Sequence, residues 1–70
     1  MERLLIHVKR TASGWQVDEA GQVRYCSYVR EQALEAADSL ALGRHFSTGN
    51  PVAVVMDMDA RDSVLLFQHG

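Results

Sequence analysis

The N-terminal part of the chain alternates apolar and polar side chains with the period of β-strands. Over residues 4–10, an apolar face alternates with a mixed face: Leu4, Ile6 and Val8 against Leu5, His7 and Lys9. Turn-forming residues at 11–14 lead into a second alternating run at 15–18, and Gly21 permits a reversal into a third run at 23–26. The pattern predicts three strands joined as a meander.

The apolar spacing changes from that of a strand to that of a helix after Ser27. Small and aliphatic residues then recur three and four positions apart: Val29, Ala33, Ala36, Ala37, Leu40 and Ala41. Ser27 is placed to be the N-cap, and Glu31 favours the positive end of the helix dipole. We expect a helix of about 14 residues that ends at Gly43, followed by a loop at 47–51 in which Pro51 prevents further helix.

Two more strands are predicted after this loop. Residues 52–55 are apolar on both faces, which is typical of a strand inside a sheet, and the polar turn 59–62 connects them to a last strand at 63–68. The element order is therefore β-β-β-α-β-β. Residues 1–70 are expected to form a single domain, a two-layer α+β fold with one helix packed on an antiparallel sheet.

We expect the core to fill the space between this sheet and the alanine face of the helix. Its predicted members are Ile6, Val8, Trp15, Val17, Ala33, Ala37, Leu40, Val54 and Leu66. Trp15 is expected to fill core volume beside the small alanine side chains rather than to stack on a ligand.

Composition narrows the class of protein. The chain has 70 residues, a hydrophobic fraction of 47% and a formal net charge of -2, which disfavours both a disordered acidic tail and a general binder of polyanions. No apolar run approaches the roughly 20 residues of a membrane span. Cys26 is the only cysteine, so no intrachain disulfide can form, and a bacterial cytoplasm is the simplest expected compartment.

The sequence offers little for catalysis or metal binding. Asp57, Asp59 and Asp62 resemble half of a calcium loop, but Arg61 occupies a ligand position and the distant glutamate is absent. The three histidines, His7, His45 and His69, lack the helical spacing that would bring two of them together. No base is apparent beside Cys26. We therefore expect a protein that is not an enzyme and has no cofactor and no metal.

Association with another chain is the function we expect. A sheet of five strands is roughly 24 Å wide, whereas one helix covers only about 10–12 Å, so apolar side chains of the C-terminal hairpin should stay exposed. The predicted outcome is a homodimer with an interface around Val55, Met56, Leu65 and Phe67. Two alternatives remain open: a different protein covers this surface, or the chain is a monomer whose ends fold over it.

Nucleic-acid binding is a further alternative. Lys9, Arg10 and Arg24 are the candidate contacts, because Arg10 and Arg24 are expected to lie near each other across the meander. Scattered cations in a chain of net negative charge are more often a solvated surface, so we expect at most a weak nucleic-acid-binding module.

Three segments together resemble a family of small uncharacterised bacterial domains: "IHVKRTASGWQV", "REQALEAADSLA" and "VAVVMDMDARDSVLLF". The resemblance covers most of the chain and depends on the Gly14-Trp15 turn and on Ala33 and Ala37 of the helix. More distantly, the chain is similar to the N-terminal domain of HicB-type antitoxins, which implies an antitoxin-like role as the partner of a second protein.

Overall fold

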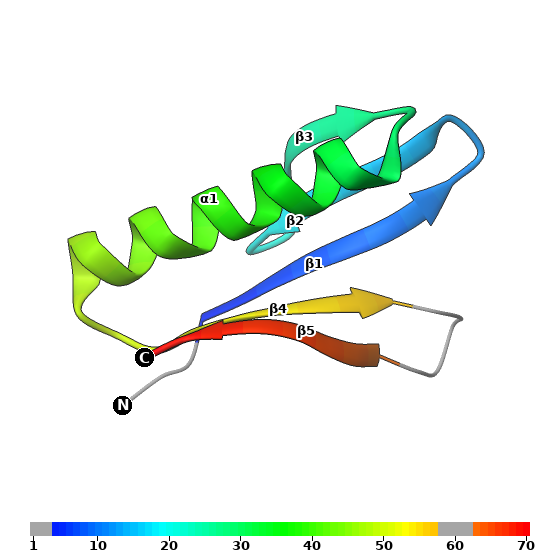
Figure 1. Cartoon of the computed structure of the whole chain (residues 1–70). Coiled ribbons are helices and arrows are strands. Elements are labelled where there is room, and N and C mark those ends of the chain that lie inside the picture. Colours follow the sequence, from blue (N-terminus) through cyan, green and yellow to red (C-terminus); the bar gives the residue numbers. More distant parts are fainter. Residues whose placement is uncertain (1–3, 58–62) are drawn as a thin grey trace.

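The fold is one helix packed on a five-stranded sheet, seen in a computed structural model that describes residues 4–57 and 63–70 (Figure 1). The elements are β1 (Leu4–Thr11), β2 (Gly14–Glu19), β3 (Gln22–Ser27), α1 (Arg30–Thr48), β4 (Val52–Asp57) and β5 (Ser63–His69). The predicted α+β class and the order β-β-β-α-β-β are both confirmed.

The sheet is mixed rather than wholly antiparallel, which corrects one detail of the prediction. Its strand order is β3-β2-β1-β4-β5, and β1 pairs with β4 in parallel, with Leu4 opposite Val52 and Val8 opposite Met56. Parallel neighbours need a long crossover connection, and α1 provides it by running back along the sheet (Figure 1). The other three neighbouring pairs are antiparallel, as expected for a meander and a hairpin.

The core lies between α1 and the three central strands. The buried cluster consists of Ile6, Val8, Val17, Ala33, Ala37, Ala41, Val52, Val54 and Met56. The alanines all belong to α1 and let the helix approach the sheet closely. Trp15, Leu40 and Leu66 were predicted inside the core, but they are only partly buried and pack against its margin.

The helix contacts every strand, yet both edge strands remain largely exposed. α1 crosses over β3, β2, β1, β4 and β5, but its width of about 10–12 Å leaves the outer parts of β3 and β5 uncovered. The exposed large apolar side chains on these two edges are Val23, Tyr25, Val64, Leu65 and Phe67.

The helix is longer than predicted because Gly43 does not end it. α1 continues through Gly43 to Thr48, and the left-handed residue that stops it is Gly49, with a φ of 73°. The N–H of Gly49 donates to the carbonyl oxygen of His45 at 2.8 Å, which satisfies a carbonyl of the last turn. A glycine inside a helix costs only about 1 kcal/mol, so packing of the alanine face carries the helix past it.

The start of the helix also differs from the prediction. Val29, not Ser27, is the N-cap, and it makes no side-chain capping bond. Ser27 still fixes the approach to α1, since its hydroxyl accepts from the Val29 N–H at 3.0 Å and donates to Gln32 Oε1 at 2.9 Å. The first turn is therefore anchored from two residues before the cap.

Candidate interaction surface

The face of the sheet opposite α1 is covered by no element within residues 4–57 and 63–70 (Figure 1). We call this surface the open face. Alternation along the strands and the register place Leu5, Ala53, Val55 and Leu65 on it, because Leu5 is opposite Ala53 and Val55 is opposite Leu65. Its apolar part thus lies over β1, β4 and β5.

The other part of the open face carries paired polar side chains. Lys9 Nζ lies 3.0 Å from Asp18 Oδ2, and Gln16 Nε2 donates to Asp18 Oδ1 at 2.8 Å. His7 Nδ1 lies 3.1 Å from Asp57 Oδ1. The Lys9–Asp18 and His7–Asp57 contacts join neighbouring strands, whereas Gln16 and Asp18 both belong to β2.

Among the described elements, β5 carries the largest number of exposed large apolar side chains. Val64, Leu65 and Phe67 retain 48%, 54% and 37% of their accessible surface. Val64 lies opposite Met56 and Phe67 opposite Val54, on the helix side, whereas Leu65 lies opposite Val55 on the open face. A register shift between Val54 and Val55 allows this arrangement.

Three of the four predicted interface residues are at least partly exposed on the C-terminal hairpin, two on the open face and one on the helix side. Leu65 and Phe67 are exposed, and Val55 is partly exposed beside Leu65. Met56 is the exception, because it is buried in the core under α1. Because residues 52–55 are apolar on both faces, the sequence does not indicate which face of β4 meets the helix, and therefore on which face Met56 lies.

The predicted nucleic-acid contacts are not brought together. Lys9 lies on the open face, whereas Arg10 alternates with Val8 and lies on the helix side. Arg10 is opposite Trp15, and Arg24 contacts Glu19, which is opposite Ile6. Arg24 lies at the register shift beside Val17 and Asp18 of β2, so it is two strands away from Arg10 and two to three residues farther along the sheet. Lys9 and Arg24 are also paired with acidic residues.

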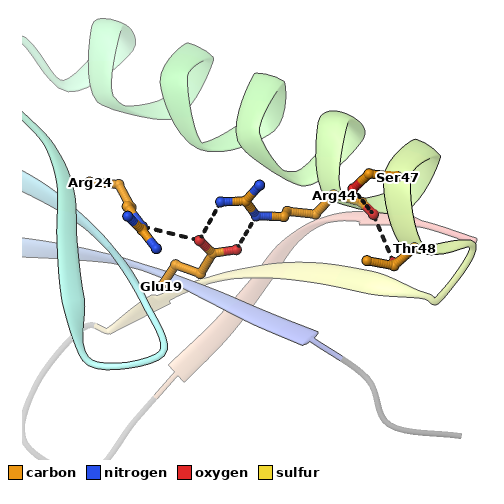
Figure 2. Close-up of polar contacts among 5 residues, drawn as sticks. All are labelled: Glu19, Arg24, Arg44, Ser47 and Thr48. Atoms are coloured by element: carbon orange, nitrogen blue, oxygen red, sulfur yellow. Dashed lines mark hydrogen bonds and ion pairs between the residues drawn. The ribbon is translucent and has the colours of Figure 1, made fainter.

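A buried carboxylate, Glu19, joins α1 to the meander, and sequence reasoning did not identify it. Arg44 donates from Nε to Glu19 Oε2 at 2.6 Å and from Nη2 to Oε1 at 3.0 Å. Arg24 Nε donates to the same Oε1 at 3.1 Å (Figure 2). The alternation of the strand could have indicated this carboxylate, because Glu19 follows Trp15 and Val17 at intervals of two residues and therefore faces the helix.

The ion pairs of Glu19 with Arg24 and Arg44 hold elements of the fold together. The two hydrogen bonds from Arg44 lower the pKa of Glu19, and the charges of Arg44 and Arg24 act in the same direction against the opposing effect of burial. Glu19 in turn raises the pKa of Arg44. Both guanidinium groups are used to neutralise one carboxylate, so the cluster fixes the helix C-terminal half over β2 and β3.

The other candidate chemical groups are dispersed. His45 Nδ1 lies 2.9 Å from the Asn50 carbonyl oxygen, and His69 Nε2 lies 2.7 Å from Asp38 Oδ1. Cys26 is exposed on β3. Asp59 and Asp62 of the calcium-like segment lie outside the described residues.

Within residues 4–57 and 63–70, no three histidine, cysteine or acidic side chains are grouped as a metal site. The same ranges contain no helix with the length and apolar character needed to cross a membrane. Comparison of the chain with protein-family models, with curated proteins and with solved structures gives no match. The resemblance to small bacterial domains and to HicB-type antitoxins therefore stays a prediction.

Proposed function

We propose that this chain is a small, non-catalytic interaction domain that associates with a second copy of itself through its C-terminal hairpin, β4 and β5. The observation that carries the proposal is the exposure of Val64, Leu65 and Phe67 on one strand. Several exposed large apolar side chains on one edge strand commonly mark an interface, because removing apolar surface from water is favourable by about 25 cal/mol per Å².

The size of the domain supports association. A chain of this length buries a small fraction of its surface when it folds alone. A standard interface covers about 800 Å² on each partner, which is about one-sixth of the 4736 Å² exposed here. The formal net charge of -2 gives only weak repulsion between two copies. A homodimer is therefore compatible with the charge of the chain and adds burial that the monomer lacks.

The test is the molar mass in solution, measured by light scattering coupled to size exclusion from about 5 to 200 µM, a range chosen for micromolar dimers. The parent chain should run as a dimer, and Phe67→Glu should run as a monomer, because the substitution places a charge in the interface. The matched control is Phe46→Glu, which changes a 78% exposed phenylalanine on α1 and should stay dimeric.

Circular dichroism establishes that each variant is folded. Leu65→Glu serves as a second probe, since Leu65 is more exposed than Phe67 and its substitution disturbs the fold less. A parent chain that remains monomeric at the highest concentration refutes self-association. Folded Phe67→Glu and Leu65→Glu variants that remain dimeric refute the placement of the interface on the hairpin.

A further inference from the structure

The two edges of the sheet differ in how they are protected from pairing with another strand. An edge strand presents unpaired N–H and C=O groups, and proteins commonly block such edges with charged side chains or proline. β3 carries Arg24 in its centre, held by Glu19. β5, "SVLLFQH", contains no aspartate, glutamate, lysine, arginine or proline over its seven residues. Of these two edges, β5 is the one without a charged block.

We propose that two copies of the chain join β5 to β5 in antiparallel orientation about a two-fold axis normal to the sheet. The two five-stranded sheets then become one continuous sheet. This inference rests on the self-association proposed above and specifies its geometry. With Val64 of one copy opposite Phe67 of the other, residues 63–68 of the two strands would run side by side for about 20 Å, and the outward backbone groups of these residues would gain partners.

The positions of the exposed side chains make this pairing self-complementary. Val64 and Phe67 both lie on the helix side of β5, and a two-fold axis normal to the sheet keeps the helix sides of the two copies together. Antiparallel pairing can therefore set Val64 of each copy opposite Phe67 of the other, on either side of the register shift that interrupts β5 between Leu65 and Phe67. Apolar cross-strand pairs of this kind stabilise sheets, and no like charges meet because the strand has none.

We assign a second copy as the occupant because β5 carries no acidic or basic residue that another β5 would repel, and because Val64 and Phe67 lie on the same side of the strand. The alternative geometry for a dimer is stacking of the two open faces, which would use Leu5, Val55 and Leu65 instead. The two geometries place different residues in the interface. Val64 lies at the edge and on the helix side, away from an open-face interface. Leu5 lies on the open face of β1, two strands from the β5 edge.

Two lysine substitutions separate the geometries, with dissociation constants measured by sedimentation velocity. Val64→Lys should weaken the dimer at least tenfold, because it places a charge in the edge contact. Leu5→Lys should change the dissociation constant by less than about twofold. A dimer weakened by Leu5→Lys but not by Val64→Lys overturns the edge pairing and leaves self-association standing. A monomeric parent refutes both proposals.

A second measurement on the unaltered chain keeps the test valid if Val64→Lys fails to fold. In a dimer mixed from isotope-labelled and unlabelled copies, filtered nuclear Overhauser spectra report only contacts between copies. Edge pairing predicts Hα–Hα contacts between the two β5 strands, which occur only when antiparallel backbones lie side by side. Contacts restricted to the side chains of Leu5, Val55 and Leu65 would overturn it.

Discussion

Replacing Glu19 with glutamine removes the charge at the centre of the Glu19, Arg24 and Arg44 cluster while keeping the shape of the side chain. The carboxylate is only 6% exposed and accepts three hydrogen bonds from guanidinium groups. Hydrogen bonds to charged groups are each worth about 1.5–3 kcal/mol. Both arginine side chains are partly exposed and regain water, so we expect a net loss of about 2 kcal/mol.

A loss of about 2 kcal/mol corresponds to a fall in Tm of about 8–16 °C for a domain of this size. The assay is thermal unfolding by circular dichroism at pH 7, with Glu35→Gln as the control, because Glu35 is an exposed carboxylate on α1. A Tm for Glu19→Gln within about 3 °C of the parent would refute the assigned role of Glu19.

The pH dependence gives an internal check on the same variant. Arg44 holds the pKa of folded Glu19 below the value of 4.5 that applies to the unfolded chain. The stabilisation is therefore fully present above pH 4.5 and is lost as the pH falls through the folded-state pKa. The difference in Tm between the parent and Glu19→Gln should accordingly shrink below pH 4.5. A difference that stays constant into acid would mean that the charge of Glu19 is not its source.

Two further predictions concern the helix and the tryptophan. Gly43→Ala should raise the free energy of unfolding by about 0.5–1 kcal/mol, because Gly43 is inside α1 with open space at the Cβ position. Gly49→Ala should lower the free energy of unfolding by about 1–2 kcal/mol, because Gly49 has a left-handed φ. Urea midpoints that shift in the same direction for both variants would contradict the assignment of Gly49 as the residue that ends α1. Trp15→Ala should lower the free energy of unfolding by about 2–3 kcal/mol, less than the 3–5 kcal/mol lost with a fully buried aromatic, because Trp15 is only half-buried. Its ring lies under the Arg30 guanidinium, 5.9 Å from the ring centroid. A urea midpoint unchanged from the parent would show that Trp15 is dispensable for packing.

Several features of the fold and surface were accessible from the pattern of residues. The alternation of Ile6 and Val8 located β1, and the exposure of Leu65 and Phe67 follows from the width of one helix relative to five strands. Glu19 was also accessible in principle, since it continues the inward positions of β2. Its partner was not, because Arg44 is 25 residues away and only the path of α1 brings it there.

What the sequence determined by itself is local: the strand and helix periods, the turn at Gly21, the alanine face of the helix and the uncharged last strand. These follow from backbone sterics and side-chain spacing within a few residues. The tertiary structure decided the parallel pairing of β1 with β4, the burial of Met56 instead of Trp15, and the extension of α1 beyond Gly43. Each of these depends on contacts between distant segments, whose energies exceed the local preference of about 1 kcal/mol that a single residue expresses.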